Sequence, residues 1–220
     1  MKHRSMIGYL IIANLLTNVL SLLINHQLYS GVSYNFSKIQ LAPNLLMILA
    51  ILSIHSVFME RQLLSHMTSI VIRSGSRNQV SVNILKMSFL MAWYQAIIQT
   101  IFQLFSNNLT LSEATLSVLV FWISWSLLII VFDGSNLHFG SALSYLMTLG
   151  LYIAGLYIGS ELIHTQFRST INLGLITQFV NFSRFQLTSL GQIILIGIIE
   201  LGLTTLLLTK FLENYDFLER

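Results

Sequence analysis

The stretch "ATLSVLVFWISWSLLIIVF", Ala114 to Phe132, carries no charged side chain. An α-helix rises about 1.5 Å per residue, so roughly 20 apolar residues span the hydrocarbon core of a bilayer. This stretch has that length. Backbone amides and carbonyls find no water in lipid, and the alternating pattern of a membrane barrel is absent from the sequence. The stretch is therefore predicted to be a transmembrane helix.

Five further runs have similar length and composition, in a chain of 220 residues that is 55% hydrophobic and 9% charged. We predict an all-α integral membrane protein with six transmembrane helices. Besides Ala114–Phe132 they cover Met6–Ile24, Leu41–Met59, Ile84–Phe105, Ser141–Ser160 and Leu190–Lys210. Residues 1–220 form a single domain in this prediction, because no linker rich in proline or glycine divides them.

The distribution of lysine and arginine predicts the orientation, since short basic loops stay on the cytosolic side. With a cytosolic N-terminus the outer side receives only Lys38, Arg168 and Arg184. The inner side then receives Lys2, Arg4, Arg61, Arg73, Arg77, Lys86, Lys210 and Arg220. Both termini are predicted to be cytosolic. The net charge of +3 is explained by this topology, and no basic patch with interleaved aromatics indicates nucleic acid.

The inner loop between the second and third runs begins with "RQLLSHMTSIVI", Arg61 to Ile72. It predicts a short amphipathic helix, because apolar side chains recur at the spacing of one helical face: Leu63, Leu64, Met67, Ile70 and Val71. Arg73 suits the negative end of this helix, and Gly75 suits the position just past it. Ser76 then favours the start of a new helix that continues into the third run.

The inner loop resembles the cytosolic coupling segment of type-2 ATP-binding-cassette (ABC) exporter permeases. The resemblance lies in Glu60 and Arg61, then Ser76 and Arg77, and then Lys86 at the start of the third run. The "GTLE" stretch and the proline before "SR" that are common in that family are absent here. In its short length the chain resembles the small permeases of bacteriocin or lantibiotic self-protection in low-GC Gram-positive bacteria.

The resemblance implies a bacterial plasma-membrane permease subunit that exports an amphipathic peptide or lipid-linked substrate. It implies a coupling helix that docks on a separate ATPase, with these docking residues: Arg61, His66, Arg73, Ser74, Gly75, Ser76 and Arg77. The sequence has no phosphate-binding loop, so ATP and magnesium are expected in the partner, and no enzyme activity or cofactor in this chain. A second permease chain, identical or related, and membrane lipid complete the expected partners.

Polar side chains within the predicted spans are candidates for a substrate path, because such groups need a partner in lipid. Gln95, Gln99 and Gln103 recur every four residues on one face of the third span, and Glu200 lies near the middle of the sixth. Asn14, Asn18, Ser21 and Asn25 form a similar row in the first span. The alternative for the amide rows is hydrogen bonding between helices. Glu200 is a substrate or proton site, a neutral acid bonded to a neighbouring amide, or a subunit-interface contact beside Gly197 and Gly202.

Other functions remain open at this stage. One is a non-transporting immunity or scaffold protein that binds a toxin through the outer segment Glu161–Ser189, and another is an ion-coupled carrier that uses Glu200. "GSNLH", Gly134–His138, and "GSALS", Gly140–Ser144, are weak candidates for intramembrane hydrolysis. The scattered histidines do not predict a metal site. Asp133 and Gly134 are interpreted as the turn that leaves the fourth span.

Overall fold

The computed structural model describes residues 3–25, 38–62, 77–107, 111–162 and 190–213. Within these ranges every regular element is an α-helix, which confirms the all-α part of the prediction for the residues described. The helices are α1 (His3–Asn25), α2 (Lys38–Gln62), α4 (Arg77–Asn107), α5 (Leu111–Phe139), α6 (Ser141–Leu162) and α7 (Leu190–Glu213). The start of α4 at Arg77 agrees with the helix predicted to follow Ser76.

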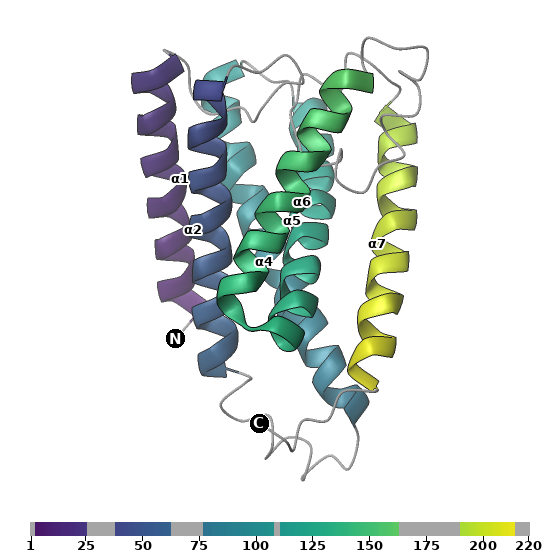
Figure 1. Ribbon diagram of the computed structural model, residues 1–220. Coiled ribbons are helices and arrows are strands. Elements are labelled where there is room, and N and C mark those ends of the chain that lie inside the picture. Colours follow the sequence, from purple (N-terminus) through teal and green to yellow (C-terminus); the bar gives the residue numbers. More distant parts are fainter. Residues whose placement is uncertain (1–2, 26–37, 63–76, 108–110, 163–189, 214–220) are drawn as a thin grey trace.

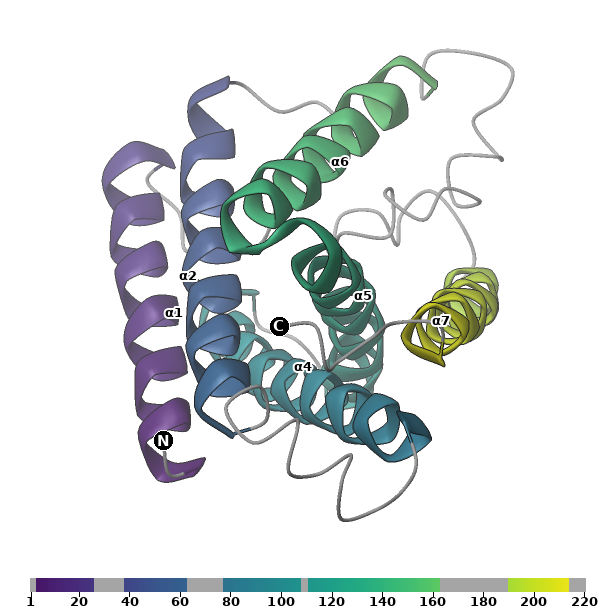
Figure 2. The ribbon, with the colours of Figure 1, turned by 60° about the horizontal axis from the view of Figure 1, so that its bottom comes forward.

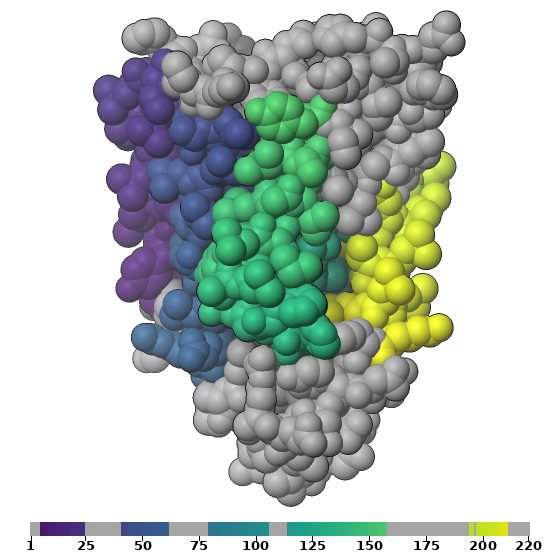
Figure 3. Space-filling model, viewed as in Figure 1, coloured from purple at the N-terminus to yellow at the C-terminus, as the bar shows by residue number. Residues whose placement is uncertain are grey.

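The helices run alternately up and down through one bundle (Figure 1). Figure 2 shows α1 and α2 side by side at one edge, α4 and α5 in the middle, and α7 at the opposite edge. The pair of α4 and α5 shares the most extensive contact, and α7 packs mainly on α5. On the face seen in Figure 3, α6 covers the bundle between α2 and α7. Two apolar cores fill the interior, and they meet at α5.

Three of the described helices are long and apolar enough to cross a membrane: Ser5–Ile24 in α1, Leu41–Arg61 in α2 and Ala114–Phe139 in α5. The apolar stretch Ser141–Tyr157 in α6 is shorter. By length and composition these helices indicate a membrane protein.

The two faces of α1 reverse the pattern of a water-soluble helix. Its buried side chains include Asn14, Thr17, Asn18 and Ser21, whereas Leu23 is 73% exposed and Leu16 is 61% exposed. In water, such a helix would bury its leucines and hydrate its amides. In lipid the preference is inverted, because polar groups there must bond to other protein groups. The packing of α1 therefore agrees with a hydrocarbon solvent.

The prediction that Asp133 and Gly134 form the turn after the fourth span is wrong. α5 continues without interruption through both residues to Phe139, and the chain turns at Gly140. Gly140 has a positive φ of 81°, the conformation that commonly ends a helix and that glycine adopts at little cost. Its N–H donates to the carbonyl of Asn136, and α6 begins at the next residue.

Replacing Gly140 with alanine is expected to lower the free energy of unfolding by about 1–2 kcal/mol, because other L-residues are disfavoured at positive φ. No atom lies within 4 Å of the added Cβ, so the fall in the free energy of unfolding would come from backbone strain rather than from a steric clash. Gly150, within α6, has equally open space and is the control. Gly150→Ala is expected to stabilise the chain by about 0.5–1 kcal/mol. Denaturation in a titration of SDS against mild detergent measures both, and equal effects would contradict the assignment of strain to Gly140.

The predicted coupling helix lies outside the described residues, apart from Arg61 and Gln62 at its start. The same holds for the docking residues His66, Arg73, Ser74, Gly75 and Ser76, and for the outer segment beyond Leu162. Among the lysines and arginines of the described helices, Arg4, Arg61, Arg77 and Lys210 lie where α2 and α7 end and α1 and α4 begin (Figure 1). We refer to this end of the bundle as the basic end. Lys86 lies ten residues into α4, and Lys38 begins α2 at the opposite end.

Candidate functional site: a polar seam between two groups of helices

Three pairs of polar side chains join the α1–α2 pair to the rest of the bundle. Asn14 of α1 bonds to Gln95 of α4, His55 of α2 bonds to Asp133 of α5, and Asn44 of α2 donates to the hydroxyl of Tyr152 of α6. All six side chains are buried. We call the boundary between the α1–α2 pair on one side and α4, α5 and α6 on the other the α1–α2 seam. Hydrogen bonds cross it at several depths, so the two groups of helices are held by directional contacts as well as by apolar packing.

The charged part of the seam is a cluster formed by His55, Asp133 and Ser88. His55 Nε2 lies 2.8 Å from Asp133 Oδ1 and 3.0 Å from Oδ2, and the Ser88 hydroxyl lies 2.6 Å from Oδ2. His55 and Ser88 are completely buried, and Asp133 is 3% exposed. The cluster therefore connects α2, α4 and α5 through one carboxylate. Charged groups at such depth are costly, and they persist when they are paired and hydrogen-bonded.

The order of these three residues does not suit nucleophilic catalysis. In a serine hydrolase the hydroxyl contacts the histidine, which takes its proton, and the carboxylate orients the histidine from the other side. Here the carboxylate lies between Ser88 and His55. The serines of the two candidate hydrolase motifs bond to the preceding helical turn instead, Ser135 to the Val131 carbonyl and Ser144 to the Gly140 carbonyl.

A cluster of amides crosses the seam between α1 and α4. Asn14 Nδ2 donates to Gln95 Oε1 at 2.9 Å, and Gln95 Nε2 donates back to Asn14 Oδ1 at 3.3 Å. The sulfur of Met47 in α2 lies 3.7 Å from the Thr17 hydroxyl and 3.8 Å from Gln95 Nε2. The two polar rows of the first and third predicted spans therefore meet at Asn14 and Gln95, through interhelical hydrogen bonding.

Replacing Asn14 with leucine is expected to cost about 1 kcal/mol or less of stability, because interhelical hydrogen bonds in membrane proteins are weak on average. The double variant N14L/Q95L isolates the pair: its coupling energy is expected near 0.6 kcal/mol. SDS titration of the two single variants and the double variant measures it. A coupling energy of zero would show that the amide pair does not hold α1 to α4.

The remaining predicted path residues do not gather at one point. Gln99 Oε1 accepts a hydrogen bond from Trp125 Nε1 of α5 at 2.8 Å, so it bonds to a different helix than Gln95. Gln103 is also buried, farther along α4. Glu200 is 8% exposed on α7, which packs against α5 and α4. The α4 amides thus face into the bundle, with Gln95 on the seam and Gln99 between α4 and α5.

Two of the predicted docking residues belong to described helices. Arg61 is exposed in the last turn of α2, and Arg77 is the first residue of α4. Arg61 lines a cavity of about 250 Å³ between α1 and α2, together with Tyr9, Ser53, Ile54 and Val57. The connection from Arg61 to Arg77 therefore joins helices on opposite sides of the α1–α2 seam.

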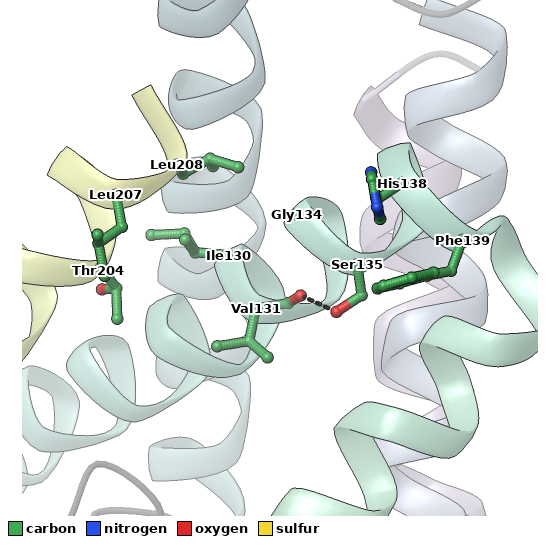
Figure 4. A pocket seen from close by; sticks show the side chains of 9 residues that line it. All are labelled: Ile130, Val131, Gly134, Ser135, His138, Phe139, Thr204, Leu207 and Leu208. Atoms are coloured by element: carbon green, nitrogen blue, oxygen red, sulfur yellow. Dashed lines mark hydrogen bonds between the residues drawn. The ribbon is translucent and has the colours of Figure 1, made fainter. Parts of the chain in front are cut away.

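A second cavity, of about 330 Å³, lies between α5 and α7 near the basic end (Figure 4). Apolar side chains form most of its lining, with Ser135, His138 and Thr204 as the polar members. Gly134 belongs to the lining, and a Cβ there would lie 3.4 Å from Leu208 Cδ1. No group of three or more potential metal ligands occurs in the part of the chain that is described.

The sequence analysis does not predict the His55–Asp133 pair, although in the sequence both residues lie near the inner ends of predicted spans. Two lone ionisable residues at similar depth on neighbouring helices are a signal for pairing. The signal was missed because Gly134 was interpreted as a turn. The helix ends before Gly140 rather than at Gly134, and the five residues between the two glycines complete α5.

Comparison with known proteins identified no match for this chain. No protein-family model, no curated protein and no solved structure matches the chain.

Proposed function

We propose that the chain is the permease subunit of an ABC exporter in a bacterial plasma membrane. In this proposal six transmembrane helices cross the bilayer with both termini in the cytosol, and a separate ATPase supplies the energy. Two permease chains, identical or related, assemble over two ATPase chains. The substrate is an amphipathic molecule, a peptide or a lipid-linked compound, that moves outward.

One observation carries the proposal: the segment that resembles a coupling segment connects α2 and α4, which lie on opposite sides of the α1–α2 seam. A displacement of that segment acts across the seam. α2 has only limited contact with α4 and α5, whereas α4 and α5 are packed extensively together. A force applied at the segment would therefore move α1 and α2 relative to the rest more readily than it would separate α4 from α5.

The seam also has suitable chemistry for an amphipathic substrate. In the closed arrangement Asn14 and Gln95 bond to each other. Opening the seam would release both amides, which then hydrogen-bond to the polar face of a substrate while the neighbouring apolar side chains contact its other face. Gln99, Gln103 and Glu200 extend the proposed path along α4 and α7. The leucines on the outer face of α1 are exposed, so in this proposal that face contacts lipid or a second permease chain.

Charge reversal in the connecting segment tests the proposal. The tagged chain is purified from its native membranes in mild detergent. An ATPase that contains a phosphate-binding loop is expected to copurify with it and to be identified by mass spectrometry. The double variant R73E/R77E is expected to lose at least tenfold of that ATPase. Lys210→Glu, at the same end but on α7, is the control and should retain it. Recovery of the ATPase with R73E/R77E, or its absence from the parent sample, would contradict the proposal.

A further inference from the structure

We propose that the His55–Asp133–Ser88 cluster is a proton-binding site, in which His55 takes up one proton on Nδ1 and thereby changes the packing of α2 against α4 and α5. The proposal concerns this chain alone and does not depend on an ATPase. It assigns to the cluster a role beyond holding three helices together.

The hydrogen bonds fix where a proton would add. An ionised carboxylate only accepts hydrogen bonds, so the nitrogen that lies within 3.0 Å of both Asp133 oxygens carries a hydrogen. The Ser88 hydroxyl donates to the same carboxylate. In a neutral imidazole the other nitrogen, Nδ1, is then a bare acceptor. Nδ1 is buried and has no hydrogen-bond partner among the described residues.

A purely structural link would not need this second nitrogen. A glutamine at position 55 would have the reach and the N–H to donate to Asp133 without adding such a nitrogen. Histidine adds a nitrogen with no partner among the described residues, and an imidazole nitrogen with an open lone pair can accept a proton. The imidazole therefore offers a buried acceptor atom beside a carboxylate, an arrangement that suits proton binding and that helix packing alone does not require.

The charge of the cluster differs between the two states. With a neutral imidazole the cluster carries the single negative charge of Asp133 inside the bundle. Addition of a proton from water forms one N–H bond at Nδ1, breaks no bond, and leaves an imidazolium–carboxylate pair with no net charge. The neutral ring requires a donor opposite Nδ1, and the protonated ring requires an acceptor there. Because one set of neighbours cannot satisfy both, proton uptake favours a different arrangement around His55.

The position of His55 connects this change to α2. Six residues, or about 9 Å of helix, separate His55 from Arg61 at the end of α2. Other ionisable groups are contributed by the helices packed against α2 and α5. The exposed ones are Tyr9, Glu60, Arg61, Lys86, His138, Tyr157 and Lys210, the half-buried ones are Tyr94 and Tyr145, and the buried ones are Tyr152 and Glu200. Asp133 is the member of the described set that bonds to the imidazole.

Nitrogen NMR of the full chain tests proton uptake. The chain, labelled with ¹⁵N-histidine and placed in lipid nanodiscs without an ATPase, is titrated from about pH 8.5 to about pH 4.5, the range that spans ordinary histidine titration. The His55 signals are assigned by elimination with variants at the other histidines. We expect one protonated nitrogen at high pH and two at low pH, and a displaced or lost titration in D133N. A His55 signal that keeps one protonation state throughout would overturn the proposal.

A distance measurement tests the coupling to helix packing. The chain contains no cysteine, so spin labels at V57C on α2 and F139C on α5, both at exposed positions, report one distance without background. We expect the distance distribution to shift between the two ends of the pH range. The shift should persist with His138→Gln, an exposed histidine on α5, and disappear with His55→Gln. If the NMR titration occurs while the distance stays constant in the parent chain, the cluster binds a proton without moving α2, and the coupling is wrong.

Discussion

Replacing His55 with leucine is expected to destabilise the folded chain by about 3 kcal/mol, because the buried Asp133 carboxylate loses the imidazole N–H that donates a hydrogen bond to it. Asp133 would keep only the Ser88 hydroxyl as a donor in the cluster, 2.6 Å from Oδ2. Asp133 is 3% exposed, so its carboxylate gains little compensation from water when the imidazole is removed. SDS titration of the purified variant measures the loss as a shift of the unfolding midpoint.

The double variant H55L/D133L separates a charge effect from a packing effect. Without the carboxylate no buried charge remains, so the double variant is expected to be far less destabilised than H55L, and a well-packed apolar replacement is often neutral or stabilising. If the two variants lose the same stability, the imidazole contributes through shape alone. This comparison concerns stability, whereas the titration of His55 concerns proton binding, so each can fail without the other.

Replacing Phe132 with alanine is expected to cost about 3 kcal/mol, at the lower end of the range for buried Phe→Ala substitutions. The ring is completely buried in the larger apolar core, and its centroid lies 4.9 Å from that of Tyr145 on α6. In lipid the loss comes mainly from van der Waals contacts that the cavity no longer offers.

Phe139, at the end of the same helix, is 49% exposed and provides the matched control. Phe139→Ala removes the same atoms from a site where lipid or water can replace them, so a change of at most about 0.5 kcal/mol is expected. Thermal unfolding in detergent, followed by tryptophan fluorescence, compares the two variants. Equal midpoints would show that Phe132 does not hold α6 against α5.

The sequence predicted the helices well because lipid imposes simple requirements. Long apolar runs must be helical, and each of the six predicted runs lies within a described helix apart from short differences at the ends. The end of α5 was missed because Gly134 is tolerated inside a helix that packs closely on α7, while Gly140 provides the required positive φ. Local sequence does not distinguish these two glycines.

The polar contacts were only partly predictable. The rows of amides in the first and third spans indicated hydrogen bonding between helices, but the partner of each residue depends on how the helices rotate and slide in the bundle. Gln95 and Gln99 share one face of α4, yet one bonds to α1 and the other to α5. The His55–Asp133 pair depends on the same rotation of α2 and α5. The rotation of each helix in the bundle cannot be read directly from a single sequence.

The polar inner face of α1 has a consequence for biosynthesis. Asn14 and Gln95 are 81 residues apart, so α1 leaves the ribosome well before its partner on α4 exists. At roughly 5–20 residues per second the delay is roughly 4–16 s. During that interval the side-chain amides of the newly synthesised α1 face the translocon, an insertase or lipid. In a chain that ends before α4, Asn14 would keep its hydrogen bond to the Leu10 carbonyl of its own helix and would lack the Gln95 partner.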